Sequence, residues 1–332
     1  MRILFDLRGT GLGNNGGSLT IVKSANVLQE LGHKVSIIDS MKNQHKWIPL
    51  KTNHIIVKKE SDIPDADCII ATGYGSVPYV ISSSERCGKK FHWIRGWELW
   101  RMNEKKIVLK VLNVPTVKIV NSSGLKKKLK SFNIHSHLVF PGNDIEDFHV
   151  IGNMRERRKV IIGGLYHSKH KTKKSLWIIN IADKLKRKYP KRVSLFMFGE
   201  PRRPNIQVID EYFRQPNIEE KNIFYNKINI WISPSDLEGL HIVPQEAMLC
   251  GCCVIGVDSP LSGTSDYLFH GKTGIYSEND YNSLMRTVEK FLFEFEIQKK
   301  IGKEARKQII SNGDRYFNMR KFIDVLKREG KK

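Results

Sequence analysis

The segment RILFDLRGTGLGNNGGSLTIVKSANVLQELGHKVSIID, residues 2–39, sets the fold class of this chain. Its first six residues form a short apolar run typical of a buried strand, and a glycine-rich turn follows. Residues 18–32 carry apolar side chains at helical spacing, with Ser18 expected as the N-cap. A second strand is expected at 33–39. The order strand, loop, helix, strand predicts a βαβ unit and a parallel sheet.

The chain has 332 residues, which is more than one hydrophobic core usually supports, so two domains are expected. Strand-like and helix-like runs alternate again after a polar stretch near residue 150. We therefore place an N-terminal Rossmann-like domain at 1–145, a linker at 146–158 and a second βα domain at 159–311. A helical tail at 312–332 is expected to pack back on the first domain. The predicted class is α/β.

Composition limits the classes of function. Hydrophobic residues make up 40% of the chain and charged residues 27%, close to the average of globular proteins. No apolar run approaches the roughly 18 to 20 residues that cross a bilayer, and the start of the chain lacks a secretory cleavage pattern. We expect a cytoplasmic protein. The formal net charge of +22 predicts an anionic partner, although a lysine-rich solvated surface would explain the same charge.

Metal and nucleic-acid binding receive little support from the sequence. The five cysteines lack the paired spacing of zinc ligands, so we expect reduced, buried thiols and no metal site. A nucleic-acid binder would be motivated by charge alone, because no zinc-finger, cold-shock or RNP-type motif is present. Nucleic acid is therefore not the expected partner.

The segment SDLEGLHIVPQEAMLCG, residues 235–251, places Glu238 and Glu246 eight positions apart in an otherwise basic chain. Pro244 suits the first position of a helix, which would put Glu246 in the first turn, at the positive end of the helix dipole. Free amides at a helix start bind anions, and carboxylates accept hydrogen bonds from sugar hydroxyls. The pattern predicts a ligand with phosphate and hydroxyl groups. Glu238 could instead cap a helix, because Ser235 lies three residues before it.

Four segments together resemble a known enzyme family. The segment PSDLEGLHIVPQEAMLCGCCVIGVD (234–258) resembles the signature of the family 4 retaining glycosyltransferases, in which two glutamates separated by seven residues precede Ala-Met and a glycine. Weaker similarity is found in GGSLTIVKSANVLQELGHKVSII (16–38), VFPGNDIEDF (139–148) and SGTSDYLFHGKTGIYS (262–277), where Asp266 replaces the commoner glutamate. The resemblance implies the GT-B fold, with two Rossmann-like βαβ domains facing each other across a cleft.

The resemblance also implies roles for individual residues. Glu238 would contact the transferred sugar as a catalytic residue. The residues implied for the donor nucleotide are Glu246, Gly239, Leu240, His241, Lys174 and Lys169. Gly164 stands where the family has a phosphate-binding arginine, and Lys169, Lys171 or Lys173 would take its place. No metal or cofactor beyond a nucleoside-diphosphate sugar is implied, because amides and lysines neutralise the leaving group.

The acceptor is expected at the carboxyl ends of the N-terminal strands. The candidates are Gly16, Gly17, Arg95 and Glu98, with His92 as a second catalytic residue, although ordinary packing would explain each of them. The resemblance implies hexosyl transfer with retention of configuration to a glycan, lipid-linked or polymer acceptor. An apolar stripe beside lysines in residues 123–132 indicates either peripheral contact with an anionic membrane or a helix that packs on the core.

A dehydrogenase is the alternative reading of the N-terminal domain. Gly11, Gly13 and Gly16 satisfy the pattern G-x-G-x-x-G, and Asp39 ends the next strand where a ribose-binding acid would lie. An NAD-dependent oxidoreductase would use these residues. Two features oppose it, because the first glycine lies several residues past the strand and the second domain offers no evident hydride-transfer site.

Overall fold

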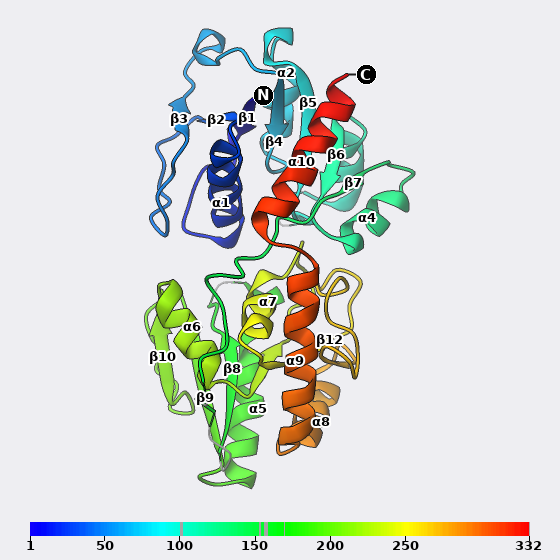
Figure 1. Cartoon of the computed structure of the whole chain (residues 1–332). Helices are drawn as coiled ribbons and strands as arrows, with labels where there is room; N and C mark the ends of the chain where they lie inside the picture. The colour runs from blue at the N-terminus through cyan, green and yellow to red at the C-terminus, as the bar shows by residue number, and fades with distance from the viewer. Residues whose placement is uncertain (100–101, 153, 156–158, 169, 332) are drawn as a thin grey trace. The chain divides into compact units, whose positions relative to one another are not determined.

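A computed structural model describes residues 1–99, 102–152, 154–155, 159–168 and 170–331 (Figure 1). The chain divides into two compact units. The first unit comprises residues 1–142 and 314–332, and the second comprises residues 143–313. The end of the chain therefore returns to the unit in which the chain began.

In the described part of the first unit, seven parallel strands form one sheet in the order β3-β2-β1-β4-β5-β6-β7. The strands are β1 (Arg2–Asp6), β2 (Lys34–Asp39), β3 (Asn53–Ile56), β4 (Cys68–Ala71), β5 (Lys89–Ile94), β6 (Val117–Val120) and β7 (His137–Leu138). The helices are α1 (Gly16–Glu30), α2 (Val77–Ser82), α3 (Glu104–Ile107), α4 (Ser123–Lys130) and α10 (Arg315–Gly330). Three short helical segments complete the unit: η1 (Glu60–Asp62), η2 (Glu85–Cys87) and η3 (Val108–Leu112).

The core of the first unit lies between the sheet and the helices α1 and α10, which contact each other (Figure 1). Phe322 of α10 is fully buried, and its ring centroid lies 5.2 Å from that of Trp93 in β5 and 6.5 Å from that of Phe5 in β1. Helices α2 and α4 contact strands β4, β5 and β6. The last helix of the chain thus completes the core of the N-terminal sheet.

The expected N-cap of α1 is wrong. The helix begins at Gly16, and its N-cap is Asn15, whose side chain accepts a hydrogen bond from the backbone N–H of Ser18. Asparagine and serine cap helices about equally well, so the sequence offered two starts three residues apart. Gly16 and Gly17 therefore lie in the first turn of α1.

In the described part of the second unit, six parallel strands form a sheet in the order β10-β9-β8-β11-β12-β13. The strands are β8 (Val160–Leu165), β9 (Val193–Gly199), β10 (Glu211–Arg214), β11 (Ile230–Ser233), β12 (Cys253–Val257) and β13 (Ile275–Ser277). The helices are α5 (Ser175–Lys188), α6 (Ile218–Lys227), α7 (Ile242–Leu249), α8 (Tyr281–Phe291) and α9 (Phe295–Ser311), with a short turn η4 (Lys171–Lys173) before α5.

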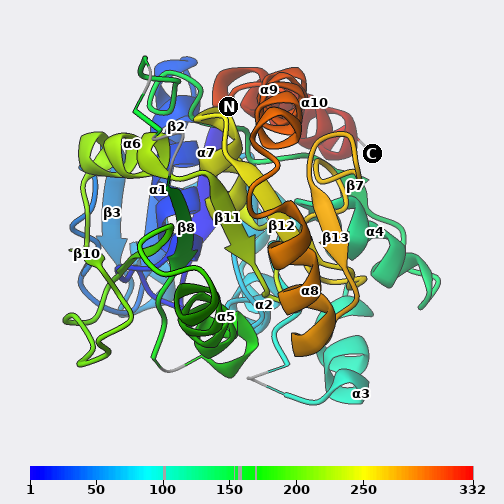
Figure 2. The same ribbon diagram turned by 90° about the horizontal axis from the view of Figure 1, so that it is seen from below.

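Both faces of the second sheet are covered by helices (Figure 2). Helices α5 and α8 pack with one hydrophobic cluster of the sheet, and α6 and α7 pack with another. Helix α9 contributes side chains to both clusters. Because the sheet is parallel and doubly covered, loops that follow its strands meet at one edge. Cys252 and Cys253, at the start of β12, are buried, and all five cysteines are free thiols.

The apolar stripe of residues 123–132 faces the interior. Leu125 and Leu129 of α4 are fully buried, and the ring of Phe132 stacks on Trp97 with centroids 6.1 Å apart. This is the core-packing interpretation of the stripe, so these apolar side chains offer no surface to a membrane. Among the described residues, no helix is both long and apolar enough to cross a bilayer.

Phe322→Ala should lower the free energy of unfolding of the first unit by about 3 to 5 kcal/mol, because it removes a fully buried ring and leaves a cavity against Trp93. Urea unfolding followed by circular dichroism measures the change. Phe317→Ala is the matched control on the same helix, because Phe317 is 46% exposed, and its change should stay within about 0.5 kcal/mol. Equal losses in the two variants would show that α10 does not complete this core.

Candidate functional site

A cluster of charged groups in the second unit lies at the carboxyl ends of the neighbouring strands β8 and β11. The chain after β8 leads to Lys173 at the end of η4, and the chain after β11 leads to Glu238. The Lys173 ammonium lies 2.5 Å from Glu238 Oε1. Two segments 65 residues apart in sequence therefore meet because their strands pair in parallel.

A single oxygen of Glu238 receives most of the contacts. Ser235 Oγ donates a hydrogen bond of 2.6 Å to Oε1, the atom that also contacts Lys173, and His241 Nε2 lies 3.7 Å from it. The capping alternative for Glu238 is wrong, because residues 234–238 are not helical and Ser235 donates to the glutamate side chain instead of capping a helix. Among the described residues, none donates a hydrogen bond to Oε2.

Charge and burial act in opposite directions on Glu238. Burial favours its neutral form, but the neighbouring charges of His241 and Lys173, with the hydrogen bonds from Lys173 and Ser235, hold the pKa of Glu238 below its usual value. Burial lowers the pKa of His241 to about 4, against the opposing effect of Glu238. His241 is therefore neutral near pH 7, and the Lys173 ammonium is the cation that then faces the Glu238 carboxylate.

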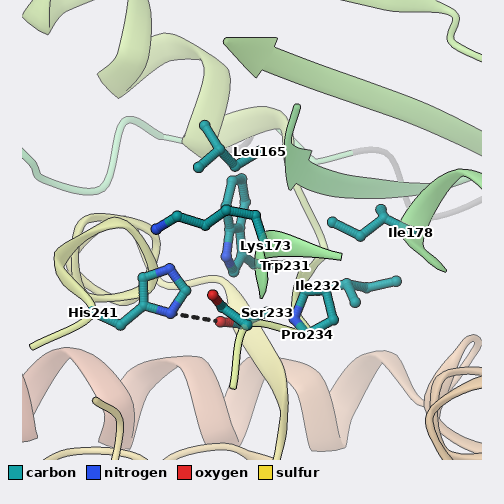
Figure 3. A pocket seen from close by; sticks show the side chains of 9 residues that line it. Leu165, Lys173, Ile178, Trp231, Ile232, Ser233, Pro234 and His241 are labelled. Carbon is teal, nitrogen blue, oxygen red and sulfur yellow. Dashed lines mark hydrogen bonds between the residues drawn. The ribbon is translucent and has the colours of Figure 1, made fainter. Parts of the chain in front are cut away.

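Hydrogen bonds fix His241 at the start of α7. Its Nδ1 lies 3.1 Å from Ser233 Oγ, and its carbonyl accepts a hydrogen bond of 2.7 Å from the hydroxyl of Tyr267. Figure 3 shows the small pocket beside these groups, into which the Lys173 side chain extends toward His241. The imidazole is thus held in one orientation next to Glu238.

Backbone contacts hold the loop between Glu238 and His241. The Glu238 N–H donates to the Leu261 carbonyl at 2.7 Å, and the His241 N–H donates to the Gly263 carbonyl at 3.1 Å. The two amides between them, of Gly239 and Leu240, have no hydrogen-bond acceptor among the described residues. Gly239 and Leu240 therefore present two unpaired donors beside Glu238, as an anion site requires.

Glu246 does not lie in the first turn of its helix, where the sequence analysis expected it. Helix α7 begins at Ile242, two residues before Pro244, so Glu246 lies beyond the first turn and the expected dipole contact is wrong. Proline is tolerated there because the first backbone N–H groups of a helix have no intrahelical acceptor. Glu246 is 7% exposed, and its Oε2 receives the Tyr225 hydroxyl at 2.8 Å and the Lys221 ammonium at 2.5 Å.

The lysines before α5 have separate contacts. The Lys174 ammonium lies 2.7 Å from Asp236 Oδ2 and 2.5 Å from Asn279 Oδ1, so it does not contact either glutamate of the motif. Lys169, the other lysine implied for the nucleotide, lies outside the described residues. A Cβ at Gly164 would approach Ile178 Cδ1 to 2.7 Å, so a side chain there would displace the core of α5. Lys173 supplies the cation that contacts Glu238.

The acceptor candidates of the first unit are close together. Arg95 follows β5 and donates one hydrogen bond of 2.5 Å to the Gly17 carbonyl and another of 2.6 Å to the Thr72 carbonyl. Glu98 Oε1 accepts the Tyr74 N–H at 3.3 Å. Arg95 therefore ties the first turn of α1 to the end of β4. Gly16 is at the start of the same turn, and a Cβ on it would meet no atom within 4 Å.

His92 lies inside the first unit. It is in β5, fully buried, with its ring centroid 5.7 Å from that of Tyr74. Burial, together with the nearby charges of Lys118 and Arg95, lowers the pKa of His92 to about 3. Both ring nitrogens are without a hydrogen-bond partner among the described residues. His92 is a neutral, enclosed imidazole in this structure.

The dinucleotide alternative does not fit the first unit. Asp39 ends β2 as expected, but its side chain is fully buried and its Oδ1 accepts the amides of Ser40 and Met41 at 2.7 and 3.4 Å. The side chain of Met41 also lies against Gly11. The carboxylate that would bind an NAD ribose is enclosed within its own turn.

Comparisons with known proteins concern the family of part of the chain and its fold. Residues 156–293 match the family model described as "Glycosyl transferases group 1". Sucrose-phosphate synthase from Thermosynechococcus elongatus has a TM-score of 0.78 at 14% identity, and the alignment covers 99% of this chain and 98% of the synthase chain. Anabaena HepE in complex with UDP-glucose has a TM-score of 0.77 at 12% identity, over 99% and 100% of the two chains. A glycosyltransferase from Rickettsia africae has a TM-score of 0.72 at 16% identity, over 98% of both chains.

These likenesses show that the chain has the GT-B fold and confirm the expected α/β class of two Rossmann-like units. No curated protein matches the sequence at a significant level. The family match and the fold together support a glycosyltransferase.

Lys221 and Tyr225 are the site residues that the sequence analysis did not identify. They precede Glu246 by 25 and 21 positions, and both belong to α6. Their spacing of four places them on one face of that helix, which is the only signal the sequence carried. Nothing in that signal indicates which residue of another helix the face contacts.

The low pKa of His241 predicts a specific acid sensitivity. An unfolded histidine titrates near 6.5, whereas folded His241 binds its proton only near pH 4, so the unfolded chain holds more protons between these values. The free energy of unfolding should therefore fall by about 2 kcal/mol from pH 7 to pH 5 through this group. Urea unfolding of the wild type and His241→Gln at both pH values measures the effect. The variant should lose correspondingly less, and equal losses would contradict the assignment.

Proposed function

We propose that this chain is a glycosyltransferase that moves a sugar from a nucleoside-diphosphate sugar to an acceptor hydroxyl, with its donor site in the second unit. One observation carries the proposal. Glu238 and Glu246 each have one carboxylate oxygen held by a lysine and a hydroxyl, while the other oxygen has no donor among the described residues. Two such acceptors, one of them beside unpaired amides, suit a ligand that carries both hydroxyls and phosphates.

The two glutamates take different parts of the donor. Glu246 accepts hydrogen bonds from the ribose hydroxyls through Oε1, and Glu238 accepts from a hydroxyl of the transferred sugar through Oε2. A carboxylate that protein donors already hold in place loses little entropy when it binds a ligand, and this lowers the free-energy cost of binding. The likeness to Anabaena HepE, whose structure holds UDP-glucose, supports a uridine nucleotide and a hexose as the first donor to test.

Positive groups beside Glu238 receive the diphosphate. The amides of Gly239 and Leu240 donate to its oxygens, and the Lys173 ammonium compensates the charge that develops as the sugar leaves. His241 is neutral and held by Ser233, so it donates or accepts a hydrogen bond without adding charge. In this proposal no metal ion is needed to stabilise the leaving group.

The resemblance to the family 4 enzymes, with two glutamates separated by seven residues, extends the proposal to stereochemistry. The transfer retains the anomeric configuration, and a donor phosphate oxygen takes the acceptor proton. No protein nucleophile is assigned. Glu238 stabilises the sugar as its bond to phosphate breaks, because a fixed carboxylate near the anomeric centre favours developing positive charge.

The acceptor is a glycan, a lipid-linked sugar or a polymer in the cytoplasm, and the first unit recognises it. Arg95 and Glu98, beside the first turn of α1, supply the polar contacts. Peripheral contact with an anionic membrane would rest on the exposed lysines of α4, Lys126, Lys127 and Lys130, since the apolar side of that helix is buried.

Glu238→Gln should lower the rate of nucleoside-diphosphate release from the donor sugar by roughly tenfold to a thousandfold, because it removes one well-placed charged contact in the transition state. Coupled detection of the released nucleoside diphosphate measures the rate. Glu219→Gln is the matched control, since Glu219 is an exposed carboxylate of α6 in the same unit. A folded Glu238→Gln enzyme as fast as the control would remove Glu238 from the reaction.

A further inference from the structure

We propose that Lys221 is a positioning residue for the nucleotide, which acts by holding the Glu246 carboxylate in one orientation, with Oε1 facing the ligand. This inference rests on the proposed donor site and assigns a role to a helix, α6, that carries no residue of the glutamate motif. The Lys221 ammonium lies 2.5 Å from Glu246 Oε2, and the Tyr225 hydroxyl donates to the same oxygen at 2.8 Å.

The contacts of Glu246 leave its two oxygens in different states. Oε2 accepts a hydrogen bond from the Tyr225 hydroxyl and forms an ion pair with the Lys221 ammonium. Among the described residues, none donates a hydrogen bond to Oε1. The carboxylate plane is therefore fixed by α6 before a ligand arrives, and a diol of the ribose type meets one oriented acceptor.

The surroundings of Lys221 keep its ammonium in place. Its side chain is 17% exposed, and Nζ lies 5.2 Å from the ring centroid of Phe148 and 5.7 Å from that of Phe198. Aromatic faces attract a cation at this range. The lysine is confined between two rings and a carboxylate, so it is a fixed part of the site and does not behave as a mobile surface charge.

The Lys221–Glu246 ion pair matters for nucleotide binding because its carboxylate is buried. Glu246 is 7% exposed, and a buried carboxylate that loses its cation lacks the partner that holds it in place, so its side chain reorients or draws water into the core. In either case the ligand loses a charge-assisted hydrogen bond to an oriented acceptor. Removal of Lys221 should therefore weaken nucleotide binding although the lysine itself need not touch the nucleotide.

Isothermal titration of UDP, GDP and ADP into the wild type first identifies the nucleotide that binds most tightly, and that nucleotide is used for the variants. Lys221→Met should bind it about tenfold to a hundredfold more weakly, the range for loss of a hydrogen bond to a charged group. Lys221→Arg keeps a cation and should stay within about fivefold of the wild type.

Lys227→Met is the matched control. Lys227 belongs to the same helix, pairs with Glu211 at 3.5 Å and has two aromatic neighbours, Phe196 and Phe213, with Nζ 5.9 Å from each ring centroid. Its carboxylate partner belongs to neither glutamate of the motif. Its nucleotide affinity should equal that of the wild type, and thermal unfolding of all the variants checks that each is folded.

A thermodynamic cycle with Glu246→Gln separates positioning from a general structural effect. If Lys221 acts through Glu246, Lys221→Met should change affinity by less than about threefold in the Glu246→Gln background. An equal loss in both backgrounds, or wild-type affinity in Lys221→Met alone, would overturn the inference while leaving the donor site intact. If the wild type binds neither these three nucleotides nor dTDP, that result would instead overturn the proposed function, and the role of Lys221 with it.

Discussion

The pairing of a buried carboxylate with a lysine from another element is the interaction on which this site depends. An ionised glutamate removed from water is stable only when a cation and further hydrogen bonds compensate it. Glu238 takes its cation from Lys173, after β8, and Glu246 takes its cation from Lys221, in α6. The first pair therefore depends on the order of the parallel strands, because β8 must lie beside β11 for it to form.

The same constraint explains why each of the two carboxylates has protein partners on one oxygen only. Protein donors occupy a single oxygen of each carboxylate, and the rest of each carboxylate stays available to hydroxyl groups. The loop that joins the two glutamates is fixed by backbone bonds to Leu261 and Gly263, which leaves the amides of Gly239 and Leu240 unpaired. Rigid positioning of this kind lowers the entropy that binding must remove. The first unit gains its rigidity differently, through Phe322 of the returning helix α10 in its core.

Local patterns in the sequence predicted the fold class well, because strand and helix periodicity and the glycine-rich turn are properties of neighbouring residues. Helix starts were predicted less well. Asn15 and Ser18 are equally good caps, and proline fits any of the first positions of a helix, so α1 begins three residues and α7 two residues before the expected start. The stripe of α4 was ambiguous, because an amphipathic helix shows the same pattern on a core and on a membrane.

The site was predicted in part, since the motif marks Glu238 and Glu246 but not their partners. Lys173 and Lys174 are adjacent, and the sequence favoured Lys174 as the residue that binds the nucleotide. The backbone of Lys174 is left-handed, with φ 47°, and this turn separates the two side chains. Lys173 therefore contacts Glu238, whereas Lys174 contacts Asp236. The measurement that tests the donor site most directly is thermal unfolding with UDP, GDP, ADP, dTDP, CMP or NAD in EDTA. One nucleoside diphosphate at about a hundred times its Kd should stabilise the protein by roughly 2.7 kcal/mol and raise its Tm without metal. Stabilisation by NAD alone, or by none of these ligands, would contradict the account.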